Sequence, residues 1–174
     1  MKNTLRTALC LLLTLCLLLP LSACGTNYRN DLTAITLCHA VKNALPAGEG
    51  WSEVSQGYIS SSGWGEDFLD YLDLTSEHLI LISAESDMNV DEIGVFHVAK
   101  ASDVKAVKGF VENYVAAKQQ KMKSLLESYN PAELPKLDAA DVKVCGNYVL
   151  YTILSEADTA TAQSAFETAL TPEN

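Results

Sequence analysis

Cys24 is the residue to which a definite chemistry is most readily assigned, because its thiol directly follows Leu-Ser-Ala at residues 21–23. A basic start and an apolar stretch over residues 8–19 come before it, and this order is typical of a secretory signal. As a helix, that stretch would rise only about 18 Å, well short of the ~30 Å hydrocarbon core of a bilayer. Residues 1–23 are therefore predicted to be a cleaved signal peptide and not a permanent membrane span.

The Leu-Ser-Ala-Cys sequence resembles a bacterial lipobox, in which the cysteine thiol receives a diacylglycerol and the cysteine becomes the mature N-terminus. An ordinary signal with a chance cysteine is the alternative, but an ordinary cleavage site would end in an A-x-A-like pattern. Two acyl chains give a stable anchor, at about 0.8 kcal/mol per buried CH₂. The sequence thus predicts lipidation of Cys24 on the extracytoplasmic face of the cell membrane, with residues 24–30 as the lipidated cysteine and a short tether.

An acidic stretch supplies a second set of residues suited to chemistry. Asp87, Asn89 and Asp91 match the first three ligand positions of a calcium loop. The sixth position of such a loop needs glycine and the twelfth needs a bidentate glutamate, but this chain has Glu92 and Val98 there. An acidic loop between two strands is therefore the preferred interpretation, and cation binding is the alternative.

Three aromatic residues, Trp51, Tyr58 and Trp64, lie in the Gly- and Ser-rich segment 46–65, the longest stretch without a helix or strand pattern. Long loops in compact domains are often functional, so these rings are candidates for a ligand-binding platform. Such rings more often hold a long loop against the core, and we prefer that interpretation.

No set of residues typical of an enzyme emerges from the sequence. Nucleophilic catalysis needs a serine or cysteine with a histidine base and an orienting acid, and none of His39, His78 and His97 stands in such a motif. These histidines also lack the ligand spacing of a zinc site, and the sequence has no C-x-x-C and no phosphate-binding loop. The sequence therefore predicts a protein that is not an enzyme and has no cofactor.

The chain is acidic, with 12 Lys and Arg residues against 22 Asp and Glu residues and a formal net charge of −10. Because Lys2 and Arg6 leave with the signal, the mature charge is −12. Such a surface repels nucleic acids and anionic headgroups. Lys118, Lys121 and Lys123 are the one local basic group; we expect them on the solvent face of a helix, and we expect the unlipidated domain not to bind anionic vesicles.

Cys38 and Cys145 are the cysteines outside the signal and the lipidation site. A disulfide between them would be worth about 4.7 kcal/mol in the chain-entropy model, and disulfides are common in exported proteins. Cys38, however, falls on the apolar stripe of a helix, where a free cysteine acts as a small hydrophobic residue. Both states stay open, and two free thiols are preferred.

The elements that position these residues follow from hydrophobic periodicity and from capping and turn signals. The long helix is expected to turn a stripe inward that includes Val111, Tyr114 and Tyr129. The predicted elements are helices over 31–45 and 66–74, strands over 78–83 and 92–99, a helix over 102–129, a hairpin that turns at Gly146-Asn147, and a last helix capped by Ser155.

A shift of 55 residues aligns the second strand and the long helix with the last strand and the last helix, as in Val95 with Leu150. This alignment predicts an internal repeat, residues 79–129 and 142–170, with both strands in one sheet. The expected fold class is α+β: an N-terminal helix followed by a ββαββα two-layer sandwich with a four-stranded, mainly antiparallel sheet.

Three features occur in order behind the lipobox: the Asp-Glu-Ile start of the second strand, the long helix, and the Gly-Asn-Tyr-Val hairpin at residues 146–149. Over residues 30–170 this order resembles a family of uncharacterised Gram-positive lipoproteins, grouped as domain of unknown function 4358. The resemblance implies an exported, membrane-anchored domain, and it implies no activity and no substrate.

Residues 31–174 are thus expected to form a single domain. The preferred hypothesis is a non-enzymatic interaction or accessory module that meets the membrane through the lipid on Cys24 and has a membrane-proximal protein partner. The alternative is a lipoprotein that binds a small molecule or a cation through the loops 46–65 or 85–92.

Overall fold

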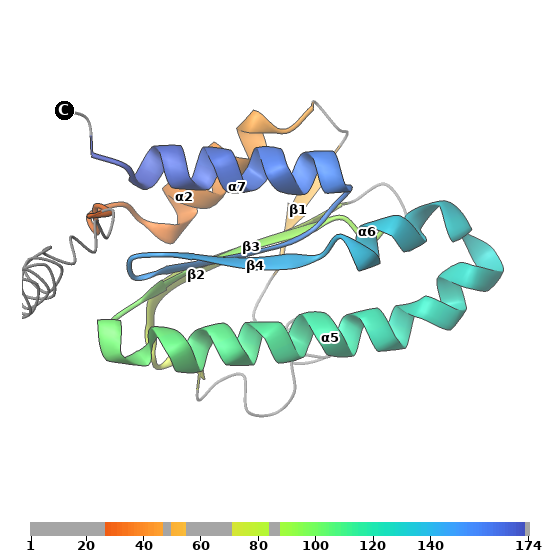
Figure 1. Cartoon of the computed structure of the whole chain (residues 1–174), viewed down its shortest axis with the longest axis horizontal. Helices are drawn as coiled ribbons and strands as arrows, with labels where there is room; N and C mark the ends of the chain where they lie inside the picture. Colours follow the sequence, from red (N-terminus) through yellow and green to blue (C-terminus); the bar gives the residue numbers. More distant parts are fainter. Residues whose placement is uncertain (1–26, 47–49, 55–70, 84–87, 173–174) are drawn as a thin grey trace, which may run out of the picture.

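Five strands form one antiparallel sheet in the part of the chain that the structure describes, in the spatial order β1-β2-β3-β5-β4 (Figure 1). This computed structural model describes residues 27–46, 50–54, 71–83 and 88–172. The strands are β1 (Trp51–Glu53), β2 (Thr75–Ser83), β3 (Glu92–Val98), β4 (Asp141–Cys145) and β5 (Tyr148–Ile153).

Helices cover both faces of this sheet, as Figure 1 shows. The helices of one face are α2 (Ala34–Ala44) and α7 (Glu156–Leu170); those of the other are α5 (Val104–Tyr129) and α6 (Leu134–Asp138). Short 3-10 helices, η1 (Ala101–Asp103) and η2 (Pro131–Glu133), flank α5. The predicted α+β class with an antiparallel sheet is confirmed. No helix in the described ranges is long and apolar enough to cross a membrane.

The four-stranded, two-layer arrangement is wrong in two respects. Strand β1 adds a fifth strand beside β2, with Trp51 opposite Ser83. Three residues are too few for the alternation that marks a strand in a sequence. The second difference is that helices lie on both faces of the sheet, so there are three layers and not two. Every residue of β5, and every residue of β3 except His97, is buried. A strand buried on both faces needs cover on both.

The two strands that the repeat equates lie in one sheet, as predicted, and the structure shows that they are neighbours in it. Strands β3 and β5 pair antiparallel, and Val95 lies opposite Leu150. The two equated helices, however, lie on opposite faces, since Val111 of α5 packs in one core cluster and Phe166 of α7 packs in the other. The aligned strand residues Val95 and Leu150 therefore face the same side of the sheet, whereas the aligned helix residues Val111 and Phe166 lie on opposite sides.

Capping side chains set the starts of the helices α2 and α7. The Thr33 hydroxyl accepts the N–H of Thr36 at 3.0 Å, so α2 begins later than the predicted residue 31. The Ser155 hydroxyl accepts the N–H of Asp158 at 3.2 Å, which confirms the predicted cap. Each hydrogen bond satisfies a backbone donor that has no partner within its helix.

The long helix α5 spans 26 residues, or about 39 Å, and its last turns lie beside α6 past the end of the strands (Figure 1). It ends before Pro131, which cannot continue a helix. Tyr129 was expected to point inward and is instead 74% exposed, because the last turn lies beyond the sheet. The buried residues of α5 are Val107, Val111, Tyr114, Val115 and Leu126.

Strands β4 and β5 form the predicted hairpin, and the turn depends on glycine. Gly146 has a φ of 58°, which a residue with a Cβ rarely adopts. Cys145 precedes the turn, and it and Cys38 are both buried, free thiols in the cluster under α2 and α7. Burial raises the pKa of Cys38 to about 12, so this thiol acts as a small apolar side chain.

Candidate functional site

The described residues best suited to acid–base chemistry surround Glu92, whose side chain is only 2% exposed. The hydroxyls of Tyr114 and Tyr151 both donate to its Oε1, each at 2.6 Å. The Lys118 ammonium donates to Oε2 and supplies the compensating charge. We call these four residues the Glu92 cluster.

Three elements position the Glu92 cluster. Glu92 begins β3, Tyr151 lies in β5, and Tyr114 and Lys118 stand one turn apart on α5. Tyr151 lies opposite Gly94 of β3, and a Cβ at Gly94 would come within 2.0 Å of the tyrosine ring. Only glycine at this position leaves room for the ring between β3 and α5.

The Glu92 cluster is closed. Burial, and then the negative charge of Glu92, raise the pKa of Tyr151 well above its ordinary value, so its hydroxyl stays a donor. No buried side-chain nitrogen or oxygen of the described residues lacks a hydrogen-bond partner. A carboxylate this buried, with both oxygens bonded, is poorly placed to reach a substrate. Its clear effect is to fix α5 against the sheet.

The sequence analysis missed the Glu92 cluster. Glu92 was placed at the start of the second strand, as a residue that breaks the calcium-loop pattern, and Tyr114 was placed on an apolar stripe. Lys118 was expected on the solvent face, but it turns inward, and its side chain is 21% exposed. The available signal was the i, i+4 spacing of Tyr114 and Lys118, which places a lysine directly beside the buried stripe.

The calcium-like residues engage protein groups. Asp91 forms an ion pair with Lys136 at 2.8 Å, and the Asn89 side chain accepts the N–H of Asp91 at 2.8 Å. Burial opposes the charge of Lys136, but hydrogen bonds and charge from Asp91 and Glu133 raise its pKa overall. Asp87 lies outside the described residues. Within those residues, no group of three or more His, Cys, Asp and Glu side chains is arranged to hold a metal.

Of the three candidate aromatic residues, Trp51 lies in the described part of the chain. It belongs to β1, is partly buried and packs against the core cluster under α2 and α7. Tyr58 and Trp64 lie outside the described residues, so a shared platform of the three rings stays a prediction.

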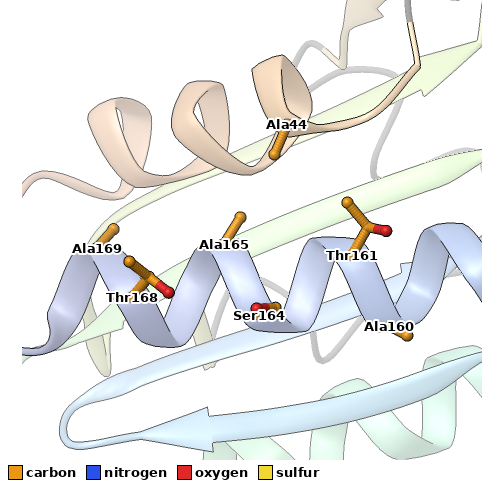
Figure 2. A pocket seen from close by; sticks show the side chains of 7 residues that line it. All are labelled: Ala44, Ala160, Thr161, Ser164, Ala165, Thr168 and Ala169. Atoms are coloured by element: carbon orange, nitrogen blue, oxygen red, sulfur yellow. The ribbon is translucent and has the colours of Figure 1, made fainter.

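A shallow groove of about 660 Å³ lies between α2 and α7. Figure 2 shows Ala44 pointing from α2 toward α7, with Ala165 and Ala169 pointing back toward α2. Every lining side chain is small and uncharged, so the groove offers contact area and a few hydroxyls without a titratable group. Its lining residues are Ala44, Ala160, Thr161, Ser164, Ala165, Thr168 and Ala169.

The first described residues dock on the folded body. The Tyr28 hydroxyl donates to Glu167 Oε1 at 2.9 Å, and the Arg29 N–H donates to the Leu170 carbonyl at 2.9 Å. A Cβ at Gly146 would lie 3.2 Å from the Cβ of Tyr28, so the hairpin turn contacts this residue closely. The tether predicted over residues 24–30 therefore includes residues that belong to the body. Cys24 itself lies outside the described residues.

Further contacts hold the same segment. The Tyr148 hydroxyl donates to the Leu32 carbonyl at 2.7 Å, and Asn30 Oδ1 lies 3.0 Å from the ring nitrogen of His97. The His97 and Tyr148 rings stack with centroids 4.3 Å apart. The chain from Tyr28 to Leu32 is thus fixed to β3 and β5 at one end of the sheet.

Comparison with known proteins gives one match. The family model described as Domain of unknown function (DUF4358) matches residues 55–154. That range contains β2 to β5, α5 and all four residues of the Glu92 cluster, and it leaves out α2, α7 and the docked N-terminal segment. No curated protein and no solved structure matches the chain.

Proposed function

Because the chain belongs to the family described as Domain of unknown function (DUF4358), whose description gives no activity, we propose a function from its own residues. In this proposal the protein is a lipoprotein of Gram-positive type, anchored through Cys24 on the extracytoplasmic face of the cell membrane. Residues 31–174 act there as a single non-enzymatic interaction or accessory domain with a membrane-proximal protein partner.

The observation that carries this proposal is the docking of Tyr28 and Arg29 on α7 and on the hairpin turn. With Tyr28 in the body, only residues 25–27 separate it from Cys24. A lipid on this cysteine would hold the domain directly at the membrane surface, without a stalk. This geometry suits a module that acts on components of the same membrane.

Two further observations favour an interaction role over an enzymatic one. Glu92, the best candidate for acid–base chemistry, and Asp91, a candidate cation ligand, are both bonded to protein groups. The groove between α2 and α7 is open and uncharged, whereas small-molecule sites are typically concave with a few convergent polar groups. The second hypothesis is that the chain binds a small molecule or a cation through the loops 46–65 or 85–92. The ion pair between Asp91 and Lys136 argues against a cation in the loop 85–92.

Metabolic labelling with an alkyne fatty acid tests the anchor. The wild-type chain and Cys16→Ser, which changes a cysteine within the signal, should take up the label and enter the detergent phase of a phase-separation assay. Cys24→Ser should do neither. A Cys24→Ser chain that is cleaved at the same bond and stays membrane-bound would contradict the lipidation.

Cross-linking in intact membranes, followed by affinity capture, tests the interaction role. A protein recovered with the wild-type chain and lost with Cys24→Ser supports a membrane-proximal partner. Recovery of the same protein with both chains would support an interaction role but contradict its dependence on the anchor. Recovery of no specific protein with either chain would contradict the interaction role.

A further inference from the structure

The two ends of the domain differ in what they carry. One end, which we call the tether pole, is formed by residues 27–33, 75–77, 97–103, 145–148 and 170–172. The opposite end, the far pole, is formed by residues 88–91, 127–141 and 155–158. Figure 1 shows the start of α5, the β4–β5 turn and the end of α7 at one end of the molecule, and the end of α5, α6 and the start of α7 at the other.

Backbone hydrogen bonds join the segments of the tether pole into one surface. The Val98 N–H donates to the Asn147 carbonyl at 2.8 Å, which ties the end of β3 to the hairpin turn. The next residue, Ala99, donates its N–H to the Leu74 carbonyl at 2.9 Å, beside the start of β2. The docked N-terminal segment packs on this surface, so the chain leaves the body toward Cys24 from the tether pole.

The length of chain outside the structure limits how the body can be oriented. Four residue steps separate Cys24 from Tyr28, and an extended chain spans at most ~3.3–3.6 Å per residue, so the reach is roughly 14 Å. The far pole lies at the other end of α5, a helix about 39 Å long. A lipid on Cys24 therefore holds the tether pole at the membrane surface while Tyr28 is docked, whereas the far pole can lie up to the length of α5 away from it.

The charges of the two poles agree with this orientation. The tether pole carries Arg29 and Lys100 against Asp31, Glu77 and Asp103, and Arg29 pairs with Asp31 at 2.8 Å. The far pole has one basic side chain, Lys136, and many acidic ones. These acidic residues are Asp91, Glu127, Glu133, Asp138, Asp141, Glu156 and Asp158.

An anionic bilayer repels the far pole more strongly than the nearly neutral tether pole. Screening in physiological salt limits this repulsion to about 8 Å. Charges at the tether pole therefore decide whether the body can rest on the headgroups, and those at the far pole hardly matter once it is turned away. The domain needs no membrane affinity of its own, which agrees with the expectation that the unlipidated form does not bind anionic vesicles.

The geometry points to the tether pole as the surface that faces the lipid headgroups, with the far pole presented away from the membrane. This inference rests on the proposed lipidation of Cys24 and adds the orientation that the docked segment imposes. The β4–β5 turn and the 3-10 helix η1 then lie next to the headgroups.

A matched pair of cysteine variants tests the orientation. Ala101→Cys lies in η1 at the tether pole and Ala132→Cys lies in η2 at the far pole, and both positions are exposed alanines in 3-10 helices. Each full-length variant is expressed and processed in a bacterium, labelled with a thiol-reactive fluorophore and reconstituted into vesicles of phosphatidylcholine and phosphatidylglycerol. Half of the vesicles contain a headgroup-nitroxide lipid. Cys38 and Cys145 are buried, and the chain without an added cysteine gives the background labelling.

The label at position 101 should be quenched several-fold more than the label at position 132. A long Gly-Ser insert after Thr26 should reduce that difference, because it lengthens the tether without touching the body. Equal quenching at both positions, or stronger quenching at 132, would overturn the orientation. Flotation of the vesicles is measured first: a protein that does not float overturns the proposed anchor and the orientation with it, whereas one that floats without the difference overturns the orientation alone.

Discussion

Two carboxylates on opposite faces of the sheet bind the same kinds of partner in different surroundings. Glu92, under α5, accepts hydrogen bonds from two tyrosine hydroxyls and a lysine, and its side chain is 2% exposed. Glu167, on α7, accepts hydrogen bonds from Tyr28 at 2.9 Å and Lys143 at 2.6 Å, and its side chain is 43% exposed. The partner groups are of the same kinds, and burial is the main difference between the two sites.

Burial makes the removal of a partner costly at Glu92 and cheap at Glu167. A buried charge that loses its partner cannot recover the hydration it gave up on folding, whereas an exposed one rehydrates. The Glu92 cluster is therefore expected to determine how α5 seats on the sheet. The Glu167 contacts are expected to affect mainly the docked N-terminal segment.

The largest effect is expected from Gly94→Ala. The new Cβ would lie 2.0 Å from the Tyr151 ring, and the ring cannot move without breaking its hydrogen bond to Glu92. Overpacking together with a lost hydrogen bond to a charged group should lower the free energy of unfolding by about 4 kcal/mol. Urea denaturation followed by circular dichroism measures this change.

Gly109→Ala is the matched control for that substitution. Gly109 lies on α5, and a Cβ there meets no atom within 4 Å. The change should therefore be neutral or stabilise the protein by up to about 1 kcal/mol, through helix propensity. If both substitutions lowered the free energy of unfolding equally, the requirement for glycine at position 94 could not be attributed to the close packing of the Tyr151 ring.

The next effect in size is expected from Lys118→Met, which leaves the buried Glu92 carboxylate without its counter-ion. The expected loss is about 3 kcal/mol of unfolding free energy, the range for a broken buried ion pair. Lys143→Met removes the equivalent partner of Glu167 and should lower the urea midpoint far less, because the exposed carboxylate rehydrates. The double variant with Glu92→Gln should recover part of the Lys118→Met loss; strict additivity would mean that the two side chains do not interact energetically.

A smaller contrast is expected between two tyrosine substitutions. Tyr114→Phe removes one of the two hydroxyls that donate to Glu92 Oε1 and should cost about 2 kcal/mol, as for a buried hydrogen bond to a charged group. Tyr28→Phe removes a partly buried donor to the more exposed Glu167 and should cost clearly less. Thermal melts of the two variants side by side give the comparison, and a larger loss for Tyr28→Phe would reverse it.

Hydrophobic periodicity was sufficient to predict β3, the hairpin, α5 and α7, because each has a long apolar pattern with a turn or cap at its end. It was not sufficient for β1, which has only three residues. It also could not assign helices to faces of the sheet, since a stripe shows which side of a helix is buried and not what covers it. Placing α5 and α7 on opposite faces required knowing that β3 and β5 are buried on both sides.

The Glu92 cluster could not be predicted because its partners are far apart in the chain. Tyr114, Lys118 and Tyr151 lie 22, 26 and 59 residues from Glu92, and no local pattern links any of them to Glu92. Glu92 was correctly placed at the start of the second strand, but nothing in the surrounding residues shows that its carboxylate is buried. The docking of Tyr28 on Glu167 spans 139 residues and was missed for the same reason.

The smallest effect, and the one that reports on the exposed carboxylate alone, is the pH dependence of Glu167→Gln. Hydrogen bonds from Lys143, and then from Tyr28, lower the pKa of Glu167 below its ordinary value of 4.5. The unfolded chain therefore binds this proton more readily than the folded one. Ionised Glu167 stabilises the fold above about pH 4.5, and that stabilisation is lost as the pH falls through the folded-state pKa.

The glutamine variant should thus have a slightly lower urea midpoint than the wild type at pH 7, and this difference in midpoint should close toward pH 3. The difference should also narrow in high salt, because exposed charges are screened. A gap that is the same at both pH values would mean that Glu167 contributes through packing of its side chain, and the contrast with Glu92 would then concern shape more than charge.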